Sequence, residues 1–166
     1  FTKRLSVIVG AHDYGTIHTE AQLPYGNLTI DEEQCTLCLS CAEACSQRAL
    51  SVHPEDNSLR FTPSACTVCG YCEVTCPEKN CLQVTGGLLM MYPEFFERRV
   101  VARDTLFRCI ECGTPFAPAK AVKKIAAVMK PLFENNPSKT RALYCCPDCK
   151  AKVMLESLQA EEGILR

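Results

Sequence analysis

Eight of the 14 cysteines fall into two runs with the same spacing, and this repeat constrains the fold of the 166-residue chain more than any other feature. Both runs read C-x2-C-x2-C-x3-C, the first from Cys35 and the second from Cys66. Three thiolates at such short intervals let one tight loop surround a 4Fe–4S cubane. Disulfide frameworks and four-thiolate zinc sites do not account for the third evenly spaced cysteine of each run. The spacing therefore predicts two 4Fe–4S clusters.

The fourth cysteine of each run is expected to bind the cluster of the other run, because one tight loop cannot supply all four corners of a cubane. The predicted ligands of one cluster are Cys35, Cys38, Cys41 and Cys76. Those of the other are Cys66, Cys69, Cys72 and Cys45. Shared ligation predicts two similar halves, each with a strand, a cluster loop, one helical turn and a returning strand. The strand candidates are Leu28–Ile30, Ala49–Val52, Leu59–Phe61 and Leu82–Thr85.

Residues 24–86 resemble the bacterial-type two-cluster ferredoxin family in these two cysteine runs. The resemblance implies a pseudo-two-fold α+β fold and low-potential transfer of single electrons. One departure concerns the residue after the fourth cysteine, which is Pro77 in the second run but Ser46 in the first. A free amide and a hydroxyl near one cluster would let the two potentials differ. Cys81 lies outside both runs, and we favour a buried packing role for it over a reserve ligand or a redox thiol.

The C-terminal part contains two further CxxC pairs, each of the kind that forms a zinc knuckle. They predict one tetrahedral four-thiolate site with the ligands Cys109, Cys112, Cys146 and Cys149. Gly113 would let the backbone turn away after the first pair. Zinc is the favoured occupant; a third iron–sulfur cluster using the adjacent Cys145 and a single iron ion are the alternatives.

A helix is expected between the two CxxC pairs, starting near Pro118 and ending or bending at Pro131. A last helix is expected from about Lys150. The predicted apolar face of the first helix carries Val122, Ile125, Met129 and Leu132. Its lysines are interpreted as a solvated face, and we predict no binding to nucleic acid.

The predicted organisation has three parts: residues 1–23 as a linking segment, 24–87 as the dicluster domain and 88–166 as a helical extension. Within the linking segment, Leu5–Val9 is rich in β-branched residues and is therefore expected to be extended, as in a β-strand. A boundary is expected near Gly86–Gly87, where the charge also changes. Residues 1–90 carry 10 acidic and 5 basic side chains, a net charge of −5, whereas residues 91–166 carry 9 and 13, a net charge of +4. The fold class is α+β, a pseudo-two-fold dicluster ferredoxin fold followed by a mainly helical, zinc-ribbon-like four-cysteine domain.

The dicluster region followed by the CIECGTPF and CCPDCK segments is similar to the C-terminal region of large bacterial iron–sulfur proteins associated with formate dehydrogenase-type oxidoreductases. This resemblance favours an electron-transfer subunit or module whose partners are redox proteins or other subunits of such a complex. A free soluble ferredoxin and an iron- or oxygen-sensing structural module are the alternatives. Eight protein thiolates would leave no open iron, so we expect no catalytic site of its own.

The cellular setting is expected to be the cytoplasm, because metal-binding thiolates need a reducing compartment. No stretch is long and apolar enough to suggest direct membrane insertion. The chain opens on Phe1 rather than Met, which suggests a removed start or a piece of a longer polypeptide. We expect four aromatic residues near the helical extension, either as a surface for lasting contact or as its core: Phe95, Phe96, Phe107 and Phe116.

Overall fold

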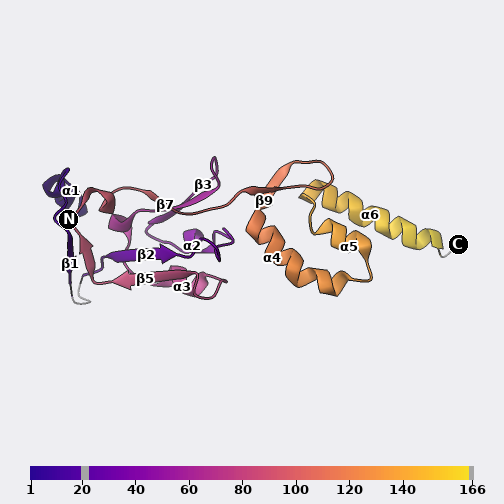
Figure 1. Cartoon of the computed structure of the whole chain (residues 1–166), viewed down its shortest axis with the longest axis horizontal. Helices are drawn as coiled ribbons and strands as arrows, with labels where there is room; N and C mark the ends of the chain where they lie inside the picture. Colours follow the sequence, from indigo (N-terminus) through magenta and orange to yellow (C-terminus); the bar gives the residue numbers. More distant parts are fainter. Residues whose placement is uncertain (20–22, 165–166) are drawn as a thin grey trace. The chain divides into compact units, whose positions relative to one another are not determined.

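The computed structural model describes residues 1–19 and 23–164, with the backbone alone for residues 157 and 159–164. It forms two compact units, Phe1–Arg103 and Asp104–Arg166 (Figure 1). The segments that follow the Gly86–Gly87 pair, up to Arg103, belong to the first of these units. Together the elements make a mixed α+β protein.

The dicluster region of the first unit consists of two short antiparallel strand pairs and two helical turns. Strand β2 (Gly26–Ile30) pairs with β5 (Leu82–Gly86), and β3 (Leu50–His53) pairs with β4 (Ser58–Phe61). These pairs confirm the four strands predicted from the sequence. Helices α2 (Ser40–Glu43) and α3 (Tyr71–Thr75) contact each other, and each lies at the end of one cysteine run.

The core of this region lies between the strands and the cysteine loops. Leu28, Leu50 and Phe61 point inward from three strands, and Cys41 and Cys72 belong to the same buried cluster. Two of the predicted metal ligands are therefore part of the hydrophobic core. The sulfur atoms of Cys41 and Cys72 therefore have apolar surroundings.

The N-terminal segment differs from the β-rich run expected at Leu5–Val9, because Thr2–Val9 forms helix α1. Leu5 and Val9, four residues apart, lie on one side of this helix and are buried with Leu89, Met90 and Phe95. Val7 and Ile8 are 81% and 66% exposed. The β-branched residues suggested a strand, but packing of the Leu5 and Val9 face against later residues determines a helix.

The other described elements of the first unit are three strands and two 3-10 helices. Strand β1 (Thr16–His18) pairs with β6 (Leu88–Met90), and the short 3-10 helix η2 (Pro93–Phe95) follows. Strand β7 (Arg99–Arg103) adds a third strand to the β3–β4 pair, with a register shift between Leu59 and Arg60. Another 3-10 turn, η1 (Pro63–Ala65), leads into the second cysteine run.

The second unit begins with a β-hairpin that the sequence analysis did not predict. Its strands are β8 (Leu106–Arg108) and β9 (Pro115–Pro118), and Phe107 packs edge-on against Phe116 with ring centroids 6.1 Å apart. Four helical elements follow: α4 (Ala119–Met129), the 3-10 helix η3 (Lys130–Phe133), α5 (Pro137–Ala142) and α6 (Pro147–Ile164). Helix α4 ends directly before Lys130-Pro131, as predicted, since proline cannot continue the hydrogen-bonding pattern.

The predicted apolar face of α4 is wrong in part. Val122 and Ala126 are its buried residues, whereas Ile125 and Leu132 are 57% and 72% exposed. Ala126 lies four residues after Val122 and therefore on the same face of the helix. The prediction considered only the large apolar residues, and it therefore placed the buried face incorrectly. Among the described residues, no helix combines the length and the apolar character needed to cross a bilayer.

Candidate metal centres

The structure brings the eight cysteines of the two runs together in two separate pockets. One pocket, here the first-run pocket, is lined by Cys35, Cys38, Cys41 and Cys76. The other, the second-run pocket, is lined by Cys66, Cys69, Cys72 and Cys45. Each pocket thus holds three cysteines of one run and the fourth of the other, which is the grouping that the spacing predicts.

The two cysteine loops repeat the same backbone conformation. Leu37 and Leu39 in the first run, and Val68 and Gly70 in the second, have positive φ angles of 50°, 66°, 55° and 76°. A β-branched residue such as Val68 rarely adopts this conformation, at a cost of about 1–3 kcal/mol. Val68 donates its backbone N–H to the Cys66 sulfur at 3.4 Å. The strained turn therefore directs an amide toward a ligand sulfur.

The exposure of the thiols also repeats between the runs. The second cysteine of each run, Cys38 or Cys69, is exposed, and the third, Cys41 or Cys72, is buried. The first and fourth members are half-buried in both runs. Corresponding cysteines of the two runs therefore have the same solvent exposure, as expected if the two cysteine loops repeat one structure.

The apolar surroundings disfavour free thiolates in both pockets. Burial raises the pKa of the Cys41 thiol to about 12 and that of Cys72 to about 11. Burial also raises the pKa of Cys35 and Cys66. Because cluster ligands must be deprotonated, these thiols release their protons when positively charged iron binds. Four sulfur donors in an apolar pocket fit a 4Fe–4S cluster.

Cys81 is buried, as expected from the sequence, and it also lines the first-run pocket. Its Sγ donates to the backbone oxygen of Asp31 at 3.6 Å. Burial, followed by the nearby Cys35 and Cys76 sulfur atoms, raises the pKa of Cys81 to about 12. Cys81 follows Cys76 by five residues outside both runs, and the structure puts it in the pocket that Cys76 also lines. Ser46, which replaces the usual proline after Cys45, is exposed.

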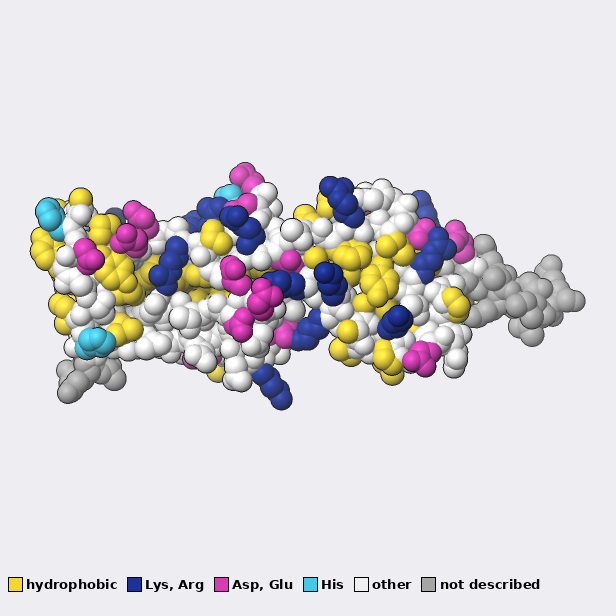
Figure 2. All heavy atoms as spheres, in the orientation of Figure 1, with side chains coloured by type: hydrophobic (Ala, Val, Ile, Leu, Met, Phe, Trp, Pro, Cys, Tyr) yellow, Lys and Arg dark blue, Asp and Glu magenta, His cyan; other side chains and the backbone are white. Residues whose placement is uncertain are grey.

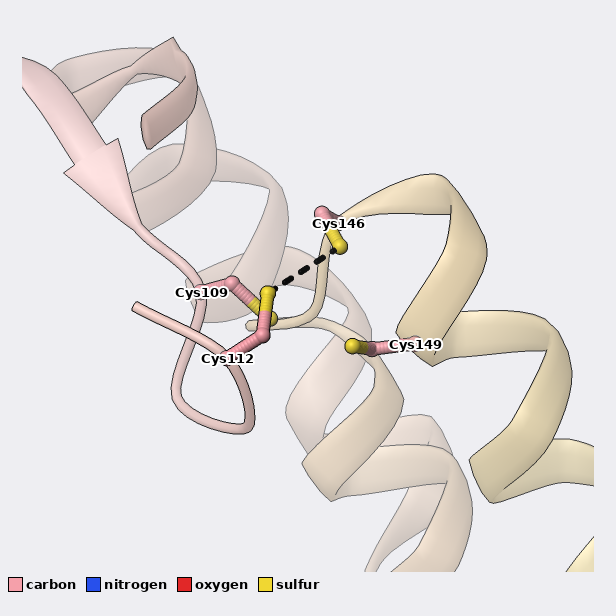
Figure 3. Close-up of side chains that lie close together, drawn as sticks. All are labelled: Cys109, Cys112, Cys146 and Cys149. Atoms are coloured by element: carbon pink, nitrogen blue, oxygen red, sulfur yellow. Dashed lines mark hydrogen bonds between the residues drawn. The ribbon is translucent and has the colours of Figure 1, made fainter. Parts of the chain in front are cut away.

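The second unit contains a four-cysteine group, here the tail tetrad, made of Cys109, Cys112, Cys146 and Cys149 (Figure 3). All four sulfur atoms lie within 4.8 Å of one another. Tetrahedral coordination with Zn–S bonds of about 2.3 Å requires sulfur atoms about 3.8 Å apart, and Cys112 Sγ lies 3.7 Å from Cys146 Sγ. The tetrad therefore fits a single tetrahedral metal ion.

The two pairs of the tail tetrad are held by different structures. Cys109 and Cys112 lie in the turn between β8 and β9, where Gly113 has a φ of 74° and donates to the Cys109 oxygen at 2.9 Å. This confirms the expected turn at Gly113. Cys149, however, lies in the first turn of α6, which begins at Pro147 directly after Cys146. The second pair is thus presented by a helix N-terminus and not by a second knuckle.

Local hydrogen bonds favour thiolates at the first pair. Burial raises the pKa of the Cys109 thiol, but backbone N–H groups of Cys112, Cys146 and Glu111 outweigh it and lower the pKa to about 6. Hydrogen bonding to Thr114 lowers the pKa of Cys112, whose Sγ lies 3.3 Å from the Thr114 hydroxyl. The lowered pKa values of these two thiols favour the thiolate form that metal binding requires.

Cys145 stands outside the tail tetrad although it is adjacent to Cys146. Its side chain is buried, and its Sγ donates to the backbone oxygen of Arg141 at 3.4 Å. The neighbouring Arg141 forms an ion pair with Glu111 in the β8–β9 turn. The structure therefore groups Cys146 with the other three cysteines, in agreement with the CxxC spacing.

Comparison with known families identifies the first of these regions. Residues 27–77 match the family described as 4Fe-4S dicluster domain. A search of curated proteins found no match to the chain. The matched segment spans both cysteine runs and therefore all eight predicted cluster ligands. The chain thus contains a dicluster domain, which binds two 4Fe–4S clusters, and a further four-cysteine metal site near its C-terminus.

Proposed function

We propose that the chain is an electron-transfer module that relays single electrons through two 4Fe–4S clusters with crossed ligation. The observation that carries this proposal is the grouping of the thiols, three from one run and one from the other in each pocket. Four protein thiolates saturate a cubane and leave no iron open to substrate. Such a centre changes its oxidation state without binding a reactant, which suits a relay better than a catalyst.

The exposure of the ligands suggests where electrons enter and leave. Cys38 and Cys69 are the exposed ligands of the two pockets, and Cys41 and Cys72 are buried in the shared core. A partner that docks beside Cys38 would lie close to one cluster, and a partner beside Cys69 would lie close to the other. The module would then connect two redox partners through its paired clusters.

The tail tetrad is proposed to hold one zinc ion with a structural role. Its four sulfur atoms surround a point, whereas a cubane carries its thiolates on four separate irons and needs them farther apart. The sulfur distances therefore favour one ion over a third cluster. A closed four-thiolate site is typical of structural zinc, and a single iron ion is the remaining alternative. Zinc would link the hairpin to α6 within a unit that has a small core.

The module is further proposed to work within a larger oxidoreductase. Phe1–Arg103 carries 12 acidic and 8 basic side chains, a net charge of −4, and oxidised clusters would add negative charge. A basic partner surface would complement it. The second unit exposes Ile110, Ile125, Val128 and Leu155, and apolar side chains among Lys and Arg are visible on its surface (Figure 2). Phe95, by contrast, is fully buried in the first unit and offers no such surface.

Size-exclusion chromatography of the native protein in moderate salt tests this assembly. We expect elution with an oxidoreductase subunit, because the exposed apolar side chains of the second unit are suited to a lasting association and not only to a weak redox encounter. Iron content should follow the larger species across the column. Elution as an 18.4 kDa monomer that exchanges electrons with several unrelated enzymes would instead support a free ferredoxin.

A further inference from the structure

The two pockets differ in their number of cysteines. Five cysteines line the first-run pocket, because Cys81 joins the four members of the crossed set. Among the described residues, four cysteines line the second-run pocket. This is an asymmetry in an otherwise repeated pair of sites, and the relay proposed above does not use it.

The backbone of Cys81 is fixed while its thiol is held weakly. The backbone oxygen of Cys81 accepts a hydrogen bond from the Asp31 N–H at 2.7 Å, and Leu82 directly after it begins β5. The thiol makes a long contact of 3.6 Å with the Asp31 oxygen, and an S–H group is a weak donor. Rotation about the Cα–Cβ bond would therefore reorient the sulfur without moving the strand.

Cys81 also approaches the pocket from the same segment as Cys76. The two are joined by the short stretch Pro77–Asn80, and the Cys81 N–H donates to the Glu78 oxygen at 3.4 Å. The side chain of Cys81 lines the same pocket as those of Cys76 and Cys35. If Cys76 is lost, a thiol from the same side of the pocket is already in place.

We propose that Cys81 is a reserve ligand of the first-run pocket that binds the iron of Cys76 when the Cys76 thiolate is removed. The inference rests on the proposed function, since it assumes a cluster in this pocket. In the exchange the Fe–S bond to Cys76 breaks and an Fe–S bond to Cys81 forms. The Cys81 proton passes to the departing thiolate, or to solvent where Cys76 has been replaced. No oxidant or reductant is needed.

Iron content of anaerobically prepared variants tests the proposal, with Cys45 as the matched residue of the second-run pocket. Cys76→Ala should keep about eight irons per chain, whereas Cys45→Ala should fall to about four, because its pocket has no fifth thiol. The double variant Cys76→Ala/Cys81→Ala should also fall to about four. The reserve-ligand proposal is wrong if Cys76→Ala holds about four irons, or if the double variant still holds about eight.

A second measurement keeps the proposal testable if Cys76→Ala does not fold. Iron release to a chelator is compared between the wild-type chain and Cys81→Ser, which preserves the shape of the side chain but supplies a poorer iron ligand. Half of the iron should leave several-fold faster from Cys81→Ser, because transient loss of Cys76 is no longer compensated. Equal release rates would overturn the proposal. A wild-type chain without about eight irons would instead contradict the proposed function itself.

Discussion

Replacing Cys45 by alanine is expected to remove the cluster of the second-run pocket, although Cys45 belongs to the first run of the sequence. Iron content should fall from about eight to about four per chain. The physical reason is that Cys45 lines the pocket of Cys66, Cys69 and Cys72. The measurement is alkylation of thiols not bound to iron under anaerobic conditions, followed by mass spectrometry of peptides.

The pattern of alkylation identifies which cluster is lost. In Cys45→Ala, we expect alkylation of Cys66, Cys69 and Cys72 and protection of the first three cysteines of the first run. Cys69→Ala serves as the matched control, because it disrupts the same pocket from within the second run and should protect the same peptides. Alkylation of Cys35, Cys38 and Cys41 in Cys45→Ala, with the second run protected, would show that ligation is not crossed.

Replacing Cys146 by serine is expected to release the metal of the tail tetrad and unfold Asp104–Arg166. Structural zinc in comparable four-ligand peptides contributes roughly 10–16 kcal/mol at pH 7, and this binding free energy is also folding free energy. The buried cluster around Cys109, Ala142 and Val153 is too small to compensate for such a loss. Zinc content and limited proteolysis of the full chain are the measurements.

Cys145→Ser provides the matched control for this experiment. Cys145 is buried and adjacent to Cys146, but its sulfur contacts the Arg141 oxygen instead of joining the tetrad. This variant should keep about one zinc per chain and resist protease. If Cys146→Ser keeps its zinc and Cys145→Ser loses it, then Cys145 is the ligand and the assignment of Cys146 is wrong. About twelve irons and no zinc in the wild-type protein would favour a third cluster.

The local chemistry of the metal sites could be predicted from the sequence because ligand geometry dictates spacing. The positive φ angles at Leu37 and Val68 follow from the need to wrap three closely spaced thiols around one pocket. Short strands such as β3 and β4 could also be predicted, because runs of apolar residues such as Leu59–Phe61 lie directly beside the cysteine loops. The ligand grouping and the short strands depend on a few neighbouring residues, which is why they could be predicted from the sequence.

The remaining features depend on contacts between distant residues. Helix α1 forms because Leu5 and Val9 meet Leu89 and Phe95, about 80 residues later, and no local pattern reports this. The backbone of Cys81 is likewise fixed by a residue 50 positions away in the sequence, because the Asp31 N–H donates to the Cys81 oxygen at 2.7 Å. The position of Cys149 in a helix rather than a knuckle was also hidden, because both arrangements use the same CxxC spacing.

Reductive titration of the anaerobically purified protein, combined with iron and sulfide analysis, tests the central claim most directly. Two saturated 4Fe–4S clusters predict about eight irons and eight sulfides per chain. They also predict reversible uptake of about two electrons per chain, one for each cluster, with an electron paramagnetic resonance signal from reduced clusters. A chain that holds about four irons or fewer, or that takes up no electrons reversibly, would contradict the account of a two-cluster relay.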